Sequence, residues 1–251
     1  MKLKDRVVIV TGGGTGIGRG ISTHFAKEGA FVVVNYATSK EAAEETVAAI
    51  TAAGGSAIPY QASVLVESEI QKMFADVAAE RGGIDVLVNN AGWSQRIPHH
   101  KLDDLTEEIW DKTLNTNLRG KFYASRAVVP YIKGKSGASI INIASIAPHA
   151  GGGSSIVYAA SKAGVISMTK SFARILAPEV RVNAIAPGFV RTRFANWPQQ
   201  VFDEAEKTLP LRRLPSPDEV GALAVFLASD ATAITGETIN IDAGQTSLGR
   251  T

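Results

Sequence analysis

Residues 7–20 read VVIVTGGGTGIGRG, a short run of valine and isoleucine followed by spaced glycines and then by a segment with helical character. A strand that turns sharply into a helix beside a phosphate needs residues without side chains, and Gly12, Gly16 and Gly18 stand where this turn must form. Amide groups at the start of the helix would then bind the phosphate charge. The Gly-x-x-x-Gly-x-Gly spacing therefore predicts a pyrophosphate-binding turn, with a turn needed only for tight packing as the alternative.

Further apolar runs alternate with alanine-rich segments that have helical spacing. Continuous apolar runs suit strands buried on both faces of a parallel sheet. The alternation predicts right-handed βαβ units in a single α/β domain spanning residues 1–251, a Rossmann-like doubly wound parallel sheet with helices on both faces. The predicted strands are 7–10, 31–34, 56–60, 85–88, 139–143, 181–185 and 238–241. The predicted helices are 17–28, 40–53, 67–80, 106–133, 157–177 and 217–227, with long functional loops at 93–104 and 189–217.

The composition is that of an ordinary globular protein, with 45% hydrophobic and 20% charged residues and a formal net charge of +2. No long basic run indicates a nucleic-acid partner. The chain has no cysteine, which excludes disulfides and thiolate chemistry, and no histidine or carboxylate recurs at ligand spacing, so no metal site is expected. No apolar stretch reaches the length of a signal-peptide core or a membrane span, and we expect a cytoplasmic protein without a membrane partner.

The end of the predicted second strand reads VVVNYATSKEAA. In dinucleotide folds an acidic side chain at this place accepts hydrogen bonds from the adenosine ribose and repels a 2′-phosphate. Asn35 stands where that acid would be. Hydrogen-bond donors and a positive charge then come from Tyr36, Thr38, Ser39 and Lys40. The pattern favours NADP(H) over NAD(H). Helix capping by Ser39 and a solvated Lys40 are the alternative.

Tyr158 and Lys162 stand four residues apart in the stretch SIVYAASKAGV, where the other residues are mostly small or apolar. On a helix the two positions share one face, so the hydroxyl and the ammonium can serve the same small volume. A free tyrosine titrates at about 10, and a fixed positive charge lowers its pKa by stabilising the phenolate. The pair therefore indicates an acid beside a fixed charge. A half-buried tyrosine beside a lysine that extends to solvent is the alternative.

The chain contains four further motifs, and each of them is weak evidence when taken alone. They are NNAG at 89–92, NTNLRG at 115–120, INIAS ending at Ser145, and APGFVRT at 186–192. With the glycine turn and the tyrosine–lysine pair, they resemble the short-chain dehydrogenase/reductase family from Val7 to about Gly244. Because the set is specific in its order, the resemblance favours the catalytic interpretation of Tyr158 and Lys162.

The resemblance implies a role for each residue of the catalytic group. Tyr158 would be the general acid/base, and Lys162 would bind the nicotinamide ribose and lower the pKa of the tyrosine. Ser145 would hold the substrate oxygen, and Asn117 would support a water-linked proton path. The order of the chain agrees, since Ser145 ends a predicted strand ahead of Tyr158, and the chain reversal can bring both hydroxyls to one carbonyl oxygen.

The resemblance also implies a cofactor site, in which Thr192 lies near the nicotinamide carboxamide. Ser63 departs from the family, whose members usually carry an aspartate there that bonds the adenine amine, so adenine recognition is weaker on this reading. Asn89 is expected to be structural. The implied cofactor-binding residues are Gly12, Thr15, Gly16, Ile17, Gly18, Asn35, Tyr36, Ser39, Ser63, Val64, Asn90, Ala91, Gly92, Tyr158, Lys162, Pro187, Gly188, Val190 and Thr192.

Together the motifs predict an NADP(H)-dependent oxidoreductase that interconverts a secondary alcohol and a ketone, with a 3-oxoacyl thioester or another carbonyl as substrate. A sugar or polyol dehydrogenase is the alternative enzyme, because such relatives share every motif. A dinucleotide-sensing regulator is the alternative outside catalysis, and no serine lies in the GxSxG turn of a hydrolase. We expect Trp93, Gln95 and His149 to line the substrate site, with simple loop packing as the alternative. The resemblance implies that residues 189–217 fold over the substrate.

Two predicted helices, 106–133 and 157–177, indicate that the chain forms an oligomer. Each has apolar residues on more faces than a single contact with the sheet can bury. The last strand adds an edge that a symmetric partner could cover. Members of the family that the chain resembles commonly form tetramers through these surfaces. We therefore predict a homotetramer, with a dimer as the alternative. The apolar residues are Phe122, Ala127, Val128 and Tyr131 on the first helix and Val165, Met168, Phe172 and Ile175 on the second.

Overall fold

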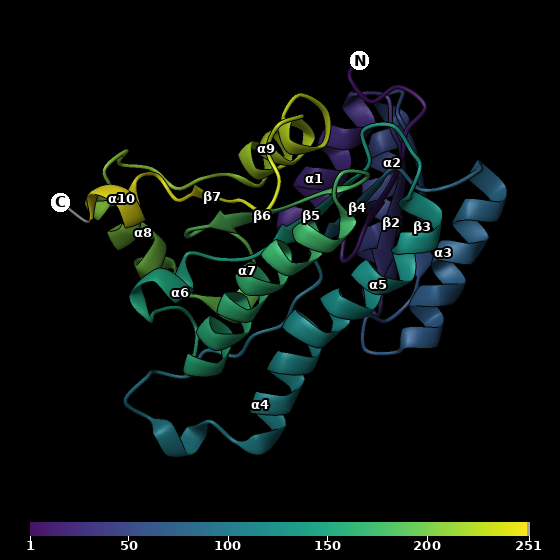
Figure 1. The fold of residues 1–251 in the computed structure, drawn as a ribbon. Coiled ribbons are helices and arrows are strands. Elements are labelled where there is room, and N and C mark those ends of the chain that lie inside the picture. Colours follow the sequence, from purple (N-terminus) through teal and green to yellow (C-terminus); the bar gives the residue numbers. More distant parts are fainter. Residues whose placement is uncertain (250–251) are drawn as a thin grey trace.

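Seven parallel strands form one sheet in the order β3-β2-β1-β4-β5-β6-β7 (Figure 1). The computed structural model describes residues 1–249. The predicted α/β class and the doubly wound parallel sheet are confirmed, and the predicted strand ends differ from the observed ones by about two residues at most. The strands are β1 Val7–Val10, β2 Phe31–Tyr36, β3 Ser56–Gln61, β4 Val86–Asn89, β5 Ser139–Ile143, β6 Arg181–Pro187 and β7 Thr238–Ile241.

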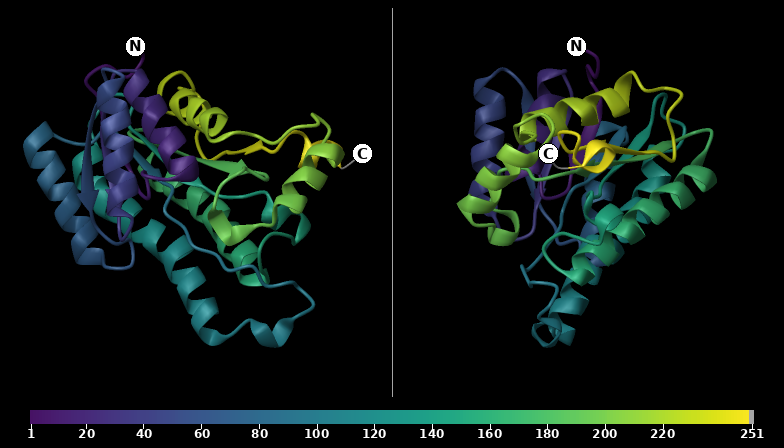
Figure 2. Two further views of the ribbon diagram at one scale, coloured as in Figure 1. Left: turned by 180° about the vertical axis from the view of Figure 1, so that it is seen from behind. Right: turned by 90° about the vertical axis from the view of Figure 1, so that its left-hand side faces the viewer.

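Helices cover both faces of this sheet (Figure 2). On one face α1, α2 and α9 bury residues such as Phe25, Ile50 and Val220 against the strands. On the other face α3, α5 and α7 bury residues such as Phe74 and Phe172. The helices are α1 Gly16–Lys27, α2 Lys40–Ala52, α3 Glu67–Arg81, α4 Glu107–Leu114, α5 Gly120–Ile132, α6 Ala147–Ala150, α7 Ile156–Leu176, α8 Gln199–Thr208, α9 Pro217–Ser229 and α10 Gln245–Leu248.

The two-sided cover explains the apolar runs. Every residue of β1, β4 and β5 is buried, because each of these central strands has a layer of helices above and below it. The strand order reverses between β1 and β4, which are neighbours although β2 and β3 come between them in the sequence. In open α/β sheets, ligands bind outside the carboxyl ends of the strands at such a switch point.

The predicted helix 106–133 is three consecutive elements rather than one. A π-helical turn, η2 Asn115–Arg119, separates α4 from α5. A π turn inserts an extra residue into the helical repeat and redirects the side chains within it, and such turns are frequent at functional sites. Asn117, one of the predicted catalytic residues, lies in this turn.

The predicted loop 189–217 contains two short elements, η3 Phe194–Asn196 and α8. In α8 the buried residues are Phe202 and Ala205, three positions apart, and the buried Leu209 follows one turn after Ala205. This spacing gives the segment one apolar face, which packs with Ala243 beyond β7. The helical signal is short and polar in composition, which explains why the segment reads as a loop in the sequence.

Of the apolar residues on the two longest predicted helices, some of which are expected to be covered by a partner subunit, several lie in the core of the single chain. Val128, Val165 and Phe172 are buried under the outer helices, so they cannot form an intersubunit contact. Phe122 and Ile175 are exposed, as is Trp110 on α4. Within residues 1–249, no helix has both the length and the apolar character needed to cross a membrane.

Candidate active site

The glycine turn between β1 and α1 has the backbone that its sequence predicts. Gly12 and Gly16 have φ angles of +62° and +49°, and a Cβ atom on Gly18 would lie 2.1 Å from the carbonyl oxygen of Gly12. In the described chain, the first turn of α1 has no acidic residue and Thr15 forms no capping hydrogen bond. The backbone amides in the first turn of α1 are therefore available to bind an anion. Because the glycines have no side chains, the pyrophosphate of a dinucleotide can come close to this backbone.

The turn is fastened to the end of β4 by a compact set of hydrogen bonds. The Thr11 hydroxyl accepts from the backbone amides of Asn90 and Ala91, both at 3.0 Å. The Asn90 side chain donates to the carbonyl oxygens of Thr11 and Gly12, also at 3.0 Å. The predicted cofactor residues of the NNAG motif therefore meet the glycine turn at the switch point.

Asn35 differs from its predicted orientation toward the adenosine end. Its side chain is 1% exposed, and its amide donates to the carbonyl oxygens of Ala62 at 2.9 Å and Tyr60 at 3.3 Å. Its oxygen accepts from the backbone amide of Gly12 at 3.4 Å. The side chain thus ties the glycine turn to β3 and the residue after it, because the carbonyls of Tyr60 and Ala62 accept hydrogen bonds from its amide.

Because Asn35 is buried, the exposed polar side chains at this corner come from the residues that follow β2. Ala37, Ser39 and Lys40 are exposed, and the Lys40 ammonium lies 3.6 Å from Glu44, one helical turn away. Tyr36 ends β2 and is buried. No carboxylate lies between β2 and α2 in the described chain, and the nearest along the sequence is Glu41 in the first turn of α2.

Ser63 and Val64, which are predicted to bind the adenine end of the cofactor, follow β3. Val64 is buried, and the Ser63 hydroxyl oxygen accepts from the backbone amide of Leu65 at 3.3 Å. Ser63 therefore holds its own turn, while its hydroxyl hydrogen is free to donate. A carboxylate at this position would offer an amine two acceptor oxygens, whereas the Ser63 hydroxyl keeps one acceptor lone pair beside its bond from Leu65.

Ser145, Tyr158 and Lys162 come together at the carboxyl end of β5 and the first turns of α7. The Ser155 hydroxyl caps α7 by accepting from the Tyr158 backbone amide at 3.3 Å, which fixes where the helix begins. The Ser145 oxygen accepts from the Ala147 backbone amide at 3.1 Å, so its hydroxyl hydrogen can point toward the Tyr158 hydroxyl, with which it bonds. The Lys162 ammonium lies 5.6 Å from the centre of the Tyr158 ring.

The electrostatics of these groups are set mainly by burial. Burial raises the pKa of Tyr158 to about 12, and the hydrogen bond from Ser145 opposes that rise. Burial lowers the pKa of Lys162 to about 8, so the group remains mostly protonated at neutral pH. The Lys162 ammonium donates to the carbonyl oxygen of Ile143 at 2.9 Å, which leaves two of its three hydrogens for a ligand.

Asn117 is fully buried, and its side chain holds the backbone of Trp93. The Asn117 oxygen accepts from the Trp93 amide at 2.8 Å, and its nitrogen donates to the Trp93 carbonyl at 2.9 Å and to Ser161 at 3.2 Å. The side-chain amide is therefore occupied with protein groups. A part for Asn117 in a water-linked proton path stays a prediction.

The segment after β6 crosses the site, and it contains a residue that the sequence analysis does not identify. The Phe194 ring lies 5.8 Å from the Tyr158 ring, and a Cβ atom on Gly92 would lie 3.9 Å from it. Thr192 packs against Gly16 of the glycine turn. An aromatic residue in a segment predicted to cover the substrate was the available signal. Pro187 ends β6, and Gly188 and Val190 lead into this segment, so the contact of all three with the nicotinamide stays a prediction.

The three residues predicted to bind the substrate lie on segments around the site. Trp93 follows the NNAG motif, and its ring stacks against the Lys112 ammonium at 4.5 Å. Gln95 and His149 are exposed, in the loop after β4 and on α6. The part of these three residues in substrate binding stays a prediction.

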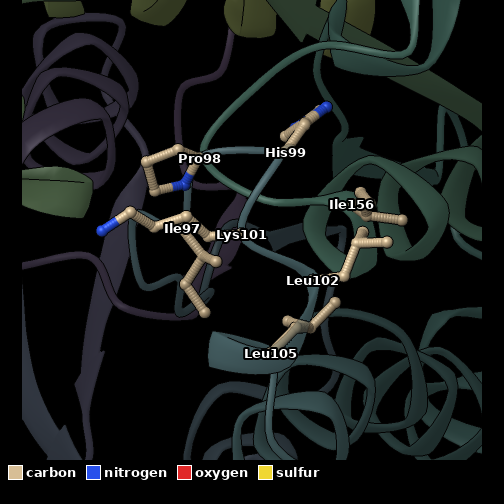
Figure 3. Close-up of a pocket in the computed structure, with 7 residues that line it drawn as sticks. All are labelled: Ile97, Pro98, His99, Lys101, Leu102, Leu105 and Ile156. Carbon is tan, nitrogen blue, oxygen red and sulfur yellow. The ribbon is translucent and has the colours of Figure 1, made fainter.

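A small apolar hollow lies under the loop after β4 (Figure 3). Ile156 lines it, and Figure 3 shows Leu102 and Leu105 beside Ile156. Because Ile156 and Tyr158 are two residues apart on α7, their side chains point to opposite sides of the helix. The hollow is therefore separate from the catalytic hydroxyls. Across residues 1–249, no three His, Asp or Glu side chains cluster closely enough to hold a metal ion.

A glycine turn after β1, a serine after β5 and a tyrosine–lysine pair on α7 together define a nicotinamide-dependent oxidoreductase that acts on CH–OH groups. Residues 12–246 match a family profile described as enoyl-(acyl carrier protein) reductase. The chain belongs to the short-chain dehydrogenase/reductase family.

Three relatives illustrate the range of the family. The 3-oxoacyl-[acyl-carrier-protein] reductase FabG of Thermotoga maritima is 39% identical over 247 residues, or 97% of this chain and 99% of that protein. A short-chain dehydrogenase of Burkholderia cenocepacia J2315, solved in complex with NADP, is 33% identical with a TM-score of 0.90. The match covers 98% of this chain and 100% of that one. A short-chain dehydrogenase/reductase of Brucella melitensis, described as a glucose/ribitol dehydrogenase, is 32% identical with a TM-score of 0.87, covering 97% of each.

Proposed function

We propose that this protein is an NADP(H)-dependent reductase that interconverts a 3-oxoacyl thioester or a similar ketone and the corresponding secondary alcohol. The observation that carries the proposal is the convergence of Ser145, Tyr158 and Lys162, which places two hydroxyls and an ammonium at one point. The relatives named 3-oxoacyl reductases support the substrate class. A cytoplasmic location stays a prediction from the sequence.

In this proposal the side chains handle the proton while the cofactor handles the hydride. The Tyr158 hydroxyl donates its proton to the substrate carbonyl oxygen, and the Ser145 hydroxyl donates a hydrogen bond to the same oxygen. The Lys162 charge stabilises the phenolate that is left on Tyr158. A bound nicotinamide supplies the hydride for reduction or accepts it for oxidation. The glycine turn, Asn90 and Thr192 would hold the two ends of the dinucleotide.

The substrate proposal is tested by following the absorbance of reduced nicotinamide with purified protein. NADPH oxidation is measured with 3-oxoacyl thioesters of increasing acyl length and with simple ketones. NADP reduction is measured with glucose and ribitol. We expect the highest kcat/KM with a 3-oxoacyl thioester. Turnover of the sugars alone would replace the proposal by the sugar-dehydrogenase alternative, and saturation by NADPH without turnover of any compound would overturn it.

A matched pair of substitutions tests the choice of cofactor. Ala37→Asp places a carboxylate on the exposed corner after β2, and we expect it to lower the kcat/KM for NADPH relative to NADH by about tenfold through repulsion of the 2′-phosphate. Asn35→Asp instead buries an acid against the carbonyls of Ala62 and Tyr60. We expect it to lower the free energy of unfolding by about 2 kcal/mol or more, with little change in preference.

The measurements for this pair are steady-state kinetics with both cofactors and urea unfolding. A wild-type protein with a higher kcat/KM for NADH than for NADPH contradicts the cofactor proposal. A shift toward NADH in Asn35→Asp with unchanged stability would show that the side chain faces the cofactor after all.

We also propose that copies of this chain assemble into a homotetramer, with second copies covering the outer helices and the edge strand β7. Trp110, Phe122 and Ile175 are exposed on α4, α5 and α7, and Ile175 is 66% exposed. Phe226 is exposed on α9, which covers the face of the sheet opposite to α5 and α7, and Leu248 is exposed on α10, which follows β7. Two separate apolar surfaces suit closed symmetry with two kinds of interface.

The assembly is tested by light scattering coupled to size exclusion. We expect the mass of four chains for the wild type and a smaller species for Ile175→Lys, because a charge on a buried interface is unfavourable while an exposed position tolerates it in one chain. Lys170→Ile, at an exposed position of the same helix, is a control for a change of charge. A wild-type mass of one chain contradicts the proposal.

A further inference from the structure

Lys121, the second residue of α5, is a buried lysine that the family motifs do not explain. Its side chain is 2% exposed, and its ammonium donates to the carbonyl oxygens of Asn89 at 2.5 Å and Ala91 at 2.9 Å. Within residues 1–249 no acidic side chain forms an ion pair with it. Burying an amine without a counter-ion is costly, so an apolar residue would be the default at this position.

The two carbonyls that Lys121 holds belong to the segment that leaves β4. In an extended segment alternate residues face the same side, and Asn89, Ala91 and Trp93 alternate. Lys121 binds the carbonyls of the first two, and Asn117, one turn earlier in the helix, binds the backbone of Trp93 on both sides. The two side chains together fix three successive points of this segment.

The opposite side of the same segment contacts the glycine turn. The Asn90 side chain donates to the Gly12 carbonyl, and a Cβ atom on Gly12 would lie 3.2 Å from the Ala91 Cα. A shift of the Ala91 backbone would therefore move the turn that is proposed to bind pyrophosphate. Lys121 lies behind this contact and supports it from the side of the helices.

We propose that Lys121 is a positioning residue for the cofactor site, whose N–H groups hold the Asn89 and Ala91 carbonyls and thereby keep the NNAG segment seated against the glycine turn. The inference rests on the proposed cofactor site. Burial and the nearby Lys162 charge lower the pKa of Lys121 well below its ordinary value. A neutral amine still has two hydrogens, enough for both carbonyls, so the contact does not require the charge.

The chain has no cysteine, which allows a direct chemical test. A Lys121→Cys variant is alkylated in urea and refolded, with 2-bromoethylamine in one sample and 1-iodopropane in the other. The first product restores an amine at the length of lysine, and the second has the same length without one. Wild-type protein taken through the same treatment is the control, since it has no thiol to react.

The readouts are the Kd for NADPH, by fluorescence titration, and hydrogen exchange of the backbone amides of residues 89–93. We expect the propyl product to bind NADPH about tenfold more weakly and to exchange faster, since two buried carbonyls lose their donors. We expect the aminoethyl product to return to within about threefold of the wild-type Kd, a difference of well under 1.4 kcal/mol. Propyl and aminoethyl products that bind NADPH equally well would overturn the inference.

A Lys121→Met variant, expressed without refolding, gives the same test where the alkylated chains do not refold. Weaker NADPH binding with faster exchange at residues 89–93 supports the inference, and wild-type values for both overturn it. Hydrogen exchange needs no cofactor, so the two proposals can fail separately. A wild-type protein that binds neither NADPH nor NADH refutes the proposed cofactor site, while unchanged exchange in the variant refutes the positioning role.

Discussion

Replacing Tyr158 by phenylalanine is expected to lower kcat by about a hundredfold or more, with folding and NADPH affinity nearly unchanged. The substitution removes one hydroxyl, which is the only group at the end of the ring that can give a proton to the substrate oxygen. The ring itself stays, and so does its contact with Phe194. Because the hydroxyl acts on the reacting oxygen, its loss affects the chemical step rather than the binding of the cofactor.

The measurements are kcat with the best substrate of the panel, the Kd for NADPH and the midpoint of urea unfolding. Tyr123→Phe is the matched control, since it removes a hydroxyl from a ring on α5 that contacts Phe122 and Arg126 instead of the catalytic group. If Tyr158→Phe retains more than about a tenth of wild-type kcat, a positioned acid is not its role.

Replacing Lys162 by methionine is expected to reduce both cofactor binding and rate, with kcat/KM lower by about a hundredfold and the Kd for NADPH higher by about tenfold. The ammonium uses one hydrogen for the Ile143 carbonyl and leaves the other two for the cofactor ribose. Methionine keeps the shape of the side chain but has no donor and no charge to stabilise the Tyr158 phenolate. Lys170→Met, at an exposed position of α7, is the control.

The same substitution has a consequence for stability as a function of pH. The pKa of Lys162 is about 8 in the folded chain, below the ordinary value of 10.5. Between these values the unfolded chain binds more protons, so this group makes the free energy of unfolding rise with pH, and below the folded pKa the cost of burying the ammonium is present in full. Urea unfolding on either side of this window should show a smaller rise in Lys162→Met than in the wild type. A variant that changes stability alone, with unchanged Kd and kcat/KM, would make Lys162 a structural lysine.

The parallel sheet could be predicted because its signals are local. Each buried strand is a continuous apolar run, and the glycines at 12, 16 and 18 mark a turn that no other residue type fits. The order of the motifs predicted that Ser145, Tyr158 and Lys162 meet at one edge of the sheet, as they do. The amphipathic signal of α8 was too short to be distinguished from a loop, and the π turn at Asn117 has no sequence signature of its own.

The sequence by itself determined the seven strands, the longer helices that cover the sheet, the glycine turn after β1, and which residues meet at the carboxyl edge of the sheet. Only the tertiary structure decided where the side chains of Asn35, Lys121 and Phe194 point. Asn35 faces inward because Ala62 and Tyr60, far along the chain, present their carbonyls to it, and Lys121 is buried because the segment after β4 offers it two acceptors. The physical reason is that periodicity and turn chemistry act within a few residues, whereas the burial and hydrogen bonding of a polar side chain depend on segments that meet only when the chain has folded.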